Sequence, residues 1–361
     1  MKILYDSECF MQPFGGVSRY YYNLLSNHGD LFSYEVSGKY SNNIYAPEVS
    51  KLKPFFPDRN FKGRHGLMKR INALADKRAI LRENYDLFHP TYYEAAVYPK
   101  EKPVVITAHD FVHERYPQYY NDPAFLQVKH QSFKRADRII AISENTKNDL
   151  LEFYPDIPAD KIVVVYHCQD WPLLKEVSEE EKKRNPYLLF TGSRNYYKNF
   201  EAFLQAAAPV MIEQNISLIC TGKPFTETEL KLIDELGISD RCKAVFAKTN
   251  EDLQKYYNHA LLFVYPSLYE GFGFPILEAF ACGCPVLLSQ ASCFPEIAGD
   301  AGIYFNPSSV ENMREVLQDT LNHSQLAHVK VQKGYERVKQ FTVQKTEEET
   351  VQVYRSLVRQ L

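Results

Sequence analysis

Short apolar runs with the length of buried strands alternate with helix-like segments along almost the whole chain. Such alternation is typical of parallel sheets whose two faces are covered by helices. The runs fall into two series, at 2–5, 87–89, 104–107, 138–142 and 162–166, and then at 187–191, 216–220, 243–246, 261–265, 285–288 and 302–305. A chain of 361 residues is long enough for two hydrophobic cores. The sequence therefore predicts an α/β protein with two doubly wound parallel-sheet domains.

The boundary between the two domains is predicted in the segment 169–186. Trp171-Pro172 interrupts the pattern there, and a charged run follows at 176–184. We therefore expect a first domain over residues 1–168 and a second over residues 169–344. From Val343 to the end of the chain, apolar residues recur at helical spacing, which predicts an amphipathic helix.

The composition argues against several classes of protein. A net charge of −3 gives no overall attraction to nucleic acid. No apolar run reaches about 18 residues, and a predicted strand begins at Lys2 in place of a signal peptide, so we expect a cytoplasmic protein. Seven cysteines without paired metal spacing favour reduced thiols. No Asp-x-Asp pair is present either, so we expect neither a metal nor a cofactor.

The loop after the predicted strand 261–265 combines a glutamate with glycines. Glu270 follows the strand's carboxyl end, the edge at which open parallel sheets bind their ligands. Gly271 and Gly273, on either side of Phe272, allow a ligand to approach the backbone without obstruction from side chains. The loop is therefore a predicted ligand-binding segment.

A short helix is predicted to start directly after this loop. Pro275 suits the first helical position, and the amides from Phe274 to Leu277 then lie at the positive end of the helix, where a diphosphate binds well. Glu278 is expected in the first turn, on the flank of the helix. With Glu270 across the loop, it is positioned to accept hydrogen bonds from ribose and sugar hydroxyls.

Two cations follow the predicted strand 187–191. Arg194 and Lys198 lie on its loop, where they are expected to neutralise charge that develops on a departing phosphate. Gly222 follows the next strand and, by its position, is expected to flank a nucleobase and ribose. Cations on a loop also occur without a ligand, and this alternative stays open at this stage.

Several motifs in order resemble those of the retaining, GT-B-type glycosyltransferases of family 4. The glycine loop stands here as EGFGFPILEAFACGCPV, and FGGVSRYYYNLL, VVITAHDF and YLLFTGSRNYYKNF match further family motifs. The segments FPEIAGDAGIYFNP and FTVQKTEEETVQVYRSLV are also similar to the family's closing segments. The resemblance implies two facing Rossmann-like domains with a cleft between them, the first binding the acceptor and the second the nucleotide sugar. It also implies that the helix 345–361 packs back on the first domain.

The resemblance carries residue roles with it. It implies catalytic roles for Glu270, Lys198, Arg194 and His109, the last of which follows the predicted strand 104–107. Many family members have Arg-Lys where this chain has Tyr197-Lys198, which leaves the role of Arg194 open. The residues expected to bind substrate are Gly15, Gly16, Gly222, Gly271, Phe272, Gly273, Phe274, Leu277 and Glu278.

The predicted function is transfer of a hexosyl group, with mannosyl preferred. The donor is a GDP- or UDP-linked sugar, and the acceptor is a saccharide or lipid-linked saccharide in surface polysaccharide or glycan synthesis. The alternative is a nucleotide-sugar epimerase of the same fold, although such an enzyme is expected to carry additional carboxylates and histidines. A glycosidase fits less well, because its two carboxyl groups flank one glycosidic bond and need no accompanying cations.

Two features leave alternatives open. The segment 51–82 contains ten basic and two acidic residues with apolar residues at helical spacing. It is predicted either to contact an anionic membrane surface as a basic amphipathic helix or to pack on its own domain. His113 and Glu114 are predicted either to bind the acceptor or to lie in a solvated loop.

Overall fold

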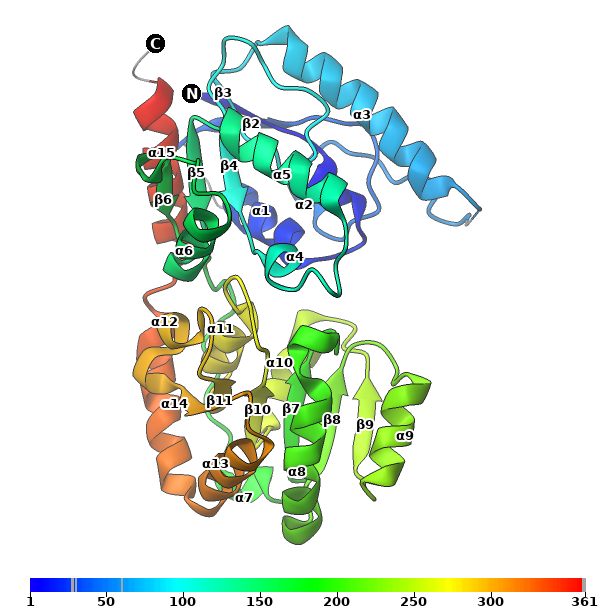
Figure 1. The fold of residues 1–361 in the computed structure, drawn as a ribbon, viewed down its shortest axis with the longest axis vertical. Coiled ribbons are helices and arrows are strands. Elements are labelled where there is room, and N and C mark those ends of the chain that lie inside the picture. Colours follow the sequence, from blue (N-terminus) through cyan, green and yellow to red (C-terminus); the bar gives the residue numbers. More distant parts are fainter. Residues whose placement is uncertain (27–28, 30, 60, 359–361) are drawn as a thin grey trace. The chain divides into compact units, whose positions relative to one another are not determined.

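The chain forms two compact units in a computed structural model that describes residues 1–26, 29, 31–59 and 61–358 (Figure 1). Unit 1 comprises Met1–Cys168 and Thr342–Leu361, and unit 2 comprises Gln169–Phe341. The sequence analysis placed its domain boundaries after residues 168 and 344. Both units contain only parallel strand pairs, so the predicted fold class is confirmed.

Unit 2 contains one six-stranded sheet in the order β12-β11-β10-β7-β8-β9. Its strands are β7 (Tyr187–Thr191), β8 (Ser217–Thr221), β9 (Cys242–Val245), β10 (Leu262–Tyr265), β11 (Val286–Ser289) and β12 (Ile303–Phe305). They confirm the second predicted series, with small shifts at the ends. The order matches that of dinucleotide-binding domains, and it reverses between the adjacent strands β7 and β10. Ligands of such sheets bind at the carboxyl edge beside this reversal.

Helices cover the sheet of unit 2 on both faces. They are α7 (Glu179–Lys182), α8 (Phe200–Gln214), α9 (Glu227–Glu235), α10 (Asn250–His259), α11 (Phe274–Ala281), α12 (Phe294–Ala298), α13 (Val310–Asn322) and α14 (Ser324–Val338), with 3₁₀ turns η3 (Tyr196–Lys198) and η4 (Gly299–Ala301). Every residue of β7, β10 and β11 is buried, which explains why these strands are uninterrupted apolar or weakly polar runs in the sequence.

Unit 1 contains two three-stranded sheets, β2-β1-β3 and β4-β5-β6. The strands are β1 (Lys2–Tyr5), β2 (Ser33–Val36), β3 (Leu87–Phe88), β4 (Val105–Ala108), β5 (Arg138–Ala141) and β6 (Ile162–Val164). A parallel bridge between Phe88 and Val104 links the two sheets. The sequence analysis missed β2, because this edge strand is only partly buried and carries the mixed sequence SYEV in place of an apolar run.

The helices of unit 1 include the last helix of the chain. They are α1 (Gly16–Ser26), α2 (Ala46–Val49), α3 (Arg64–Arg82), α4 (Val112–Arg115), α5 (Pro123–Arg135), α6 (Glu144–Phe153) and α15 (Val343–Val358), with 3₁₀ turns η1 (Glu8–Met11) and η2 (Ala159–Lys161). The predicted last helix is therefore confirmed as far as Val358, and its predicted residues 359–361 lie outside the described residues.

The helix α15 belongs to unit 1 (Figure 1), where a buried polar network holds it. The hydroxyl of Tyr354 is 2.8 Å from the Tyr5 hydroxyl and 2.7 Å from Nδ1 of His89. Nε2 of His89 is in turn 2.9 Å from the hydroxyl of Thr107. Because buried polar groups need partners, this network fixes the rotation of the helix as well as its position.

The basic segment 51–82 is helical only from Arg64 onward, so the prediction of one helix over the whole segment is wrong. Gly63, with a φ of 88°, sets the start of α3. The helix buries Met68, Asn72, Asp76 and Ile80, a stripe with four-residue spacing that packs on unit 1. Among the described residues, no helix is long and apolar enough to cross a bilayer.

Candidate functional site

Lys198 and Glu270 form an ion pair at the strand reversal of unit 2. Lys198 follows β7 and Glu270 follows β10, so the two loops start from adjacent strands at the carboxyl edge of the sheet. Nζ of Lys198 is 2.5 Å from Oε1 of Glu270, and each side chain is 13% exposed. The amide of Leu268 donates to the carbonyl of Tyr197 at 2.7 Å and joins the loops directly. The structure thus brings together two predicted catalytic residues that are far apart in the sequence.

Ser292 holds the backbone of Glu270 from the loop after β11. Its hydroxyl accepts a hydrogen bond from the Glu270 amide at 3.1 Å and donates one to the Glu270 carbonyl at 2.5 Å. The neighbouring Cys293 thiol donates to the carbonyl of Phe272 at 3.0 Å. The sequence analysis missed Ser292, because its motif carries no sign that it contacts the glycine loop.

The start of α11 has the predicted glycine but fewer free amides than predicted. Gly273 adopts a φ of 93°, and a Cβ there would lie 3.1 Å from the Ile276 side chain. The helix begins at Phe274, one residue before the predicted start, and no side chain caps it. Pro275 has no N–H, and the Ile276 amide donates to the Gly273 carbonyl at 2.9 Å. The prediction that all amides from Phe274 to Leu277 are free is therefore wrong.

The aromatic side chains of the loop pack within unit 2. Phe272 is buried, and its ring lies 5.6 Å from that of Phe274 and 5.9 Å from that of Phe341. Leu277 is also buried. Gly271 lies between Glu270 and Phe272, in the part of the loop held by Ser292. The side chains of Phe272 and Leu277 therefore belong to the core, and their predicted contact with substrate stays a prediction.

Glu278 lies inside the unit, on the second turn of α11, so its predicted place in the first turn is wrong. The hydroxyl of Tyr257 donates to Oε2 of Glu278 at 2.9 Å and lies 3.2 Å from the Thr191 hydroxyl at the end of β7. Burial and the Glu278 carboxylate raise the pKa of Tyr257 well above its ordinary value, so the phenol remains a donor. The two groups connect α10, α11 and β7 beneath the glycine loop.

Arg194 binds to residues of α9 and of the loop before this helix. Its guanidinium bonds Glu229 at 2.7 Å and donates to the carbonyls of Lys223 and Pro224 at 3.0 and 2.8 Å. It also lies over the ring of Phe225, 4.9 Å from the centroid. Burial alone would raise the pKa of Glu229, but the hydrogen bond and charge of Arg194 hold this pKa below its ordinary value. Arg194 is thus held in an ion pair with Glu229, 35 residues away, which was missed, and its role at the phosphate stays a prediction.

Gly222 has a structural reason to be glycine. Its φ is 134°, and a Cβ there would lie 3.0 Å from the carbonyl oxygen of Gly192. Its amide donates to the carbonyl of Val245 at 2.8 Å. These contacts join the ends of β7, β8 and β9 and account for the residue without a ligand.

His109 lies in the core of unit 1, at the end of β4. Its amide donates to the hydroxyl of Tyr93 at 3.0 Å, and its ring is 5.5 Å from that of Tyr20. Burial lowers the pKa of His109 to about 4, so the imidazole is neutral at pH 7. Its Nε2 atom is buried and has no hydrogen-bond partner among the described residues.

Gly15 and Gly16 form the entry to α1. The amide of Arg19 and the hydroxyl of Ser18 both donate to the Gly15 carbonyl at 3.0 Å. A Cβ on Gly16 would meet no described atom within 4 Å, so packing within the chain does not explain this glycine. The backbone at the helix entry is accordingly open to a ligand.

The loop that carries His109 is held by a buried ion pair that the sequence analysis missed. Nζ of Lys129 lies 2.8 Å from Glu114 and donates to the Asp110 carbonyl at 2.6 Å. The Tyr154 hydroxyl donates to the same Glu114 carboxylate at 2.8 Å. The solvated-loop alternative for His113 and Glu114 is wrong, since Glu114 is buried in an ion pair and His113 packs against aromatic rings. Acceptor binding by these residues stays a prediction.

Within the described ranges, no group of three or more His, Cys, Asp or Glu side chains is arranged to hold a metal ion. All seven cysteines are free thiols. Cys282 and Cys284 are both buried in unit 2 at the end of α11, where they pack in the core.

Two family profiles match the chain in succession. The profile "Glycosyltransferase Family 4" matches residues 14–170, and "Glycosyl transferases group 1" matches residues 174–337. The chain is a GT-B glycosyltransferase of group 1 and family 4. The first match lies in unit 1 up to its last two residues, and the second lies in unit 2, including the Lys198–Glu270 pair. The predicted family and enzyme class are therefore confirmed.

Relatives of this glycosyltransferase are found in Escherichia coli. O-antigen chain mannosyltransferase B is 24% identical over 387 residues, which covers 99% of this chain and 100% of the relative. Serotype-specific mannosyltransferase WbdA is 33% identical over 223 residues, which covers 56% of this chain and 27% of that longer protein. Among solved structures, sucrose-phosphate synthase from Thermosynechococcus elongatus has a TM-score of 0.80 at 20% identity and full coverage of both chains.

Proposed function

We propose that this glycosyltransferase moves a hexosyl group, preferentially mannosyl, from a nucleotide diphosphate sugar to a saccharide or lipid-linked saccharide acceptor, with retention of configuration. The observation that carries the proposal is the Lys198–Glu270 pair at the strand reversal of unit 2, beside the glycine loop. The preference for mannose rests on the mannosyltransferase relatives. By the same analogy, the product belongs to surface polysaccharide or another glycan.

Lys198 supplies the charge that the departing diphosphate needs. An ammonium group that is largely excluded from water stabilises a developing phosphate oxyanion more strongly than a solvated one. In the free protein, Glu270 neutralises this ammonium at 2.5 Å. We infer that a bound diphosphate accepts a hydrogen bond from the Lys198 ammonium, while the Glu270 carboxylate turns toward the hydroxyls of the sugar.

The glycine loop supplies the rest of the donor site. Gly271 and Gly273 keep the backbone open, and in this proposal the donor's phosphates lie at the positive end of α11. Glu278, held by Tyr257 beneath this loop, is assigned to the ribose. Because Lys198 and the positive end of α11 provide positive charge at the diphosphate, the donor needs no metal ion in this proposal.

The transfer itself needs no protein nucleophile in this proposal. The bond between the anomeric carbon and the diphosphate oxygen breaks, and the acceptor oxygen forms its bond on the same face of the sugar. The departing phosphate oxygen takes the acceptor's hydroxyl proton, so protons and charges balance. The resemblance to family 4 implies this course, and the residues around Glu270 supply orientation and charge.

Unit 1 is assigned to the acceptor and the transferred sugar. His109 is neutral at pH 7, so its imidazole can accept or donate one hydrogen bond to a sugar hydroxyl but cannot act as a cation. The open backbone at Gly16 is a second contact for substrate.

A surface of α3 fits an anionic lipid headgroup layer, which would bring the enzyme to a lipid-linked acceptor. Leu67, Leu74 and Leu81 recur every seven residues and are 44%, 61% and 52% exposed. The exposed cations of this helix include Arg70, Lys77, Arg78 and Arg82, whereas its one acidic residue, Asp76, is buried. Exposed leucines flanked by cations are typical of helices that lie on anionic membranes.

Flotation with lipid vesicles tests the membrane part of the proposal. The protein should float with vesicles that contain anionic lipid and stay behind with neutral ones, and replacement of all three leucines by serine should abolish flotation. Replacement of three exposed leucines elsewhere, Leu173, Leu230 and Leu326, is the matched control. Equal recovery with neutral and anionic vesicles would contradict the assignment.

Incubation with sugar nucleotides and a mannose-containing oligosaccharide tests the reaction. GDP-mannose should give an oligosaccharide that is one hexose longer, and the new linkage should have the anomeric configuration of the donor. Donor alone should stay nearly unchanged. Conversion of the donor into another sugar nucleotide without acceptor would instead indicate an epimerase.

A further inference from the structure

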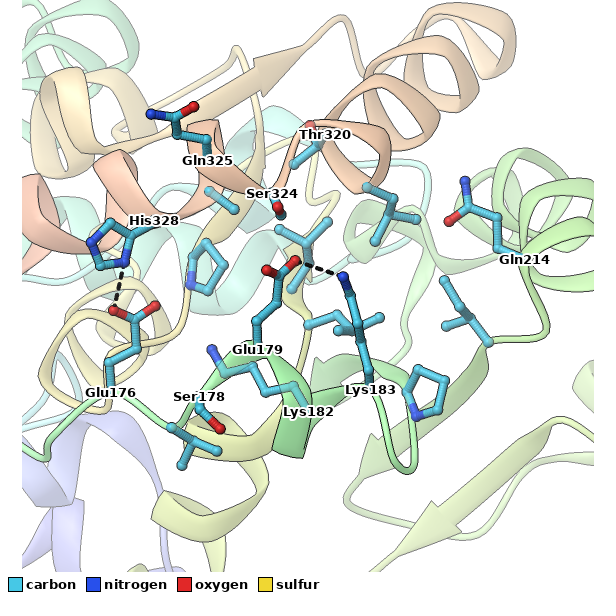
Figure 2. A pocket seen from close by; sticks show the side chains of 18 residues that line it. Glu176, Ser178, Glu179, Lys182, Lys183, Gln214, Thr320, Ser324, Gln325 and His328 are labelled. Carbon is cyan, nitrogen blue, oxygen red and sulfur yellow. Dashed lines mark ion pairs between the residues drawn. The ribbon is translucent and has the colours of Figure 1, made fainter.

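A cavity of about 710 Å³ lies at the edge of unit 2 opposite the glycine loop (Figure 2). Its lining includes Pro186, Leu261 and Pro285, which directly precede β7, β10 and β11. The cavity therefore opens at the amino ends of the strands, whereas Lys198 and Glu270 follow their carboxyl ends. Its volume lies in the range of cavities that bind small molecules, roughly 300–1,000 Å³.

The segment that closes one side of the cavity is tied firmly to the rest of unit 2. The Leu174 amide donates to the carbonyl of Ala281 at 2.7 Å, and the Tyr335 hydroxyl donates to the Leu174 carbonyl at 2.6 Å. Gly283 makes this approach possible, because a Cβ there would lie 2.2 Å from the Tyr335 hydroxyl. The cavity wall is thus a built part of the fold.

The two carboxylates that line the cavity already have partners. Glu179 is 2.9 Å from the ammonium of Lys183, and Glu176 is 3.0 Å from Nδ1 of His328 (Figure 2). Hydrogen bonds from Lys183 and Ser324 hold the pKa of Glu179 below its ordinary value. Neither carboxylate lies within ion-pair distance of the remaining lysine of the lining, Lys182.

Lys182 is the exception among these charged groups. Its residue is only 6% exposed, it lines the cavity, and its ammonium has no ion pair or hydrogen bond with any described residue. Figure 2 shows its side chain extending away from the Lys183–Glu179 pair. The aliphatic part of this side chain is enclosed by the lining, and its ammonium is left without a charged partner for a ligand that enters the cavity.

A second positive feature lies at the same cavity. The first residues of α14, Ser324 and Gln325, line it, and this helix of 15 residues starts without a side-chain cap at His323. Part of this positive end is already taken by Glu179, which accepts a hydrogen bond from Ser324. Apolar side chains form much of the remaining lining, among them Val177, Ile216, Leu262 and Leu321.

We propose that this cavity is a second binding site, for a small organic anion with an apolar body. The anionic group, a carboxylate or phosphate monoester, pairs with Lys182, and the apolar body lies against the aliphatic walls. The site is separate from the proposed donor site and does not depend on the proposed transfer reaction.

Calorimetric titration with a matched set of probes tests the proposal. Octanoate carries both features, acetate carries only the charge, and octan-1-ol carries only the apolar body. Octanoate should bind at least about tenfold more tightly than octan-1-ol, which lacks the charge-assisted hydrogen bond, and than acetate, which lacks the apolar body. Octyl phosphate distinguishes a phosphate monoester from a carboxylate as the preferred group. Absence of octanoate and octyl phosphate binding would overturn the proposal.

Substitution of Lys182 identifies the site. Lys182→Met should weaken octanoate binding about tenfold and leave octan-1-ol binding unchanged, whereas Lys182→Arg should retain it. Lys175→Met, on the same segment but exposed and outside the lining, is the control. Thermal unfolding checks that each variant is folded. Equal octanoate affinity in wild type and a folded Lys182→Met variant would overturn the assignment.

Discussion

The two units each contain a short lysine–glutamate pair, and the pairs differ in their surroundings. The Lys198–Glu270 pair of unit 2 joins two loops, retains 13% exposure on each side chain, and lies beside an uncapped helix start. The Lys129–Glu114 pair of unit 1 is 1% and 5% exposed. Its ammonium is further enclosed by the rings of Phe111 and Tyr93, at 4.2 and 5.1 Å from their centroids.

We propose that this difference separates a ligand-binding pair in unit 2 from a structural pair in unit 1. Lys129 donates a hydrogen bond to the Asp110 carbonyl, and Glu114 accepts one from the Tyr154 hydroxyl. Both charged groups are therefore satisfied within the core of unit 1. Lys198 has Glu270 as its charged partner and an adjoining loop of glycines, so a phosphate can share its ammonium. In this proposal, the same two residue types stabilise a loop in unit 1 and bind the donor's phosphate in unit 2.

Removal of Lys129 should have the largest effect on stability. Lys129→Met leaves Glu114 as a buried carboxylate without its cation, which should lower the free energy of unfolding by about 3–5 kcal/mol. Urea denaturation measures this loss. Lys134→Met, on the same helix but in an exposed pair with Asp156, should cost no more than about 1 kcal/mol. Equal losses in both variants would contradict the structural role of the buried pair.

Removal of Lys198 should affect turnover instead. Lys198→Ala should lower kcat by about 100- to 1,000-fold, because one preorganised donor to the departing oxyanion is lost. Its free energy of unfolding should change much less than that of Lys129→Met. Lys231→Ala, at an exposed position of α9, is the control for loss of a cation in unit 2. Full turnover in Lys198→Ala would exclude the proposed role.

The histidine beside the buried pair should give unit 1 a distinctive pH dependence. Burial holds the folded pKa of His109 at about 4, below its ordinary value of 6.5, so its contribution is unchanged above pH 6.5 and stability is lost as the pH falls toward 4. At pH 5 the loss from this group is about 2 kcal/mol. Urea denaturation of His109→Gln between pH 7.5 and 4.5 should give a shallower fall than wild type. Identical slopes would show that His109 is not held neutral by burial.

Of the four substitutions, replacement of Ser292 should have the smallest effect. Ser292→Ala removes both hydrogen bonds to the Glu270 backbone, so kcat should fall by about tenfold while nucleotide affinity changes little. Ser239→Ala, at an exposed position of the same unit, is the control. If the substitution lowered stability without altering kcat, Ser292 would have only a structural role.

Much of the fold could be predicted from the sequence because buried parallel strands are apolar over their whole length. The fully buried strands β7, β10 and β11 of unit 2 were found in this way, whereas the half-exposed β2 was not. The start of α3 was misplaced because the basic residues continue upstream of Gly63, and charge alone does not indicate a helix. Gly63 sets the boundary through its backbone conformation.

The site was predictable only where a local motif carries the chemistry. Glu270 lies in a glycine-rich loop and Lys198 in a basic loop, each directly after a buried strand, and the sheet brings the two loops together. The ion pair of Arg194 was missed because its partner, Glu229, lies on a helix 35 residues further on. Lys129 was missed for the same reason, since the charge of a lysine in an amphipathic helix is ordinarily solvated. Long-range pairing of charges is decided by tertiary packing.

The most direct test of the account is a crystal structure of the protein with a nucleoside diphosphate bound. The account predicts diphosphate oxygens within hydrogen-bond distance, about 2.7–3.2 Å, of Nζ of Lys198 and next to the first turn of α11. A diphosphate bound elsewhere in unit 2, with Lys198 and Glu270 still paired as in the free protein, would contradict it.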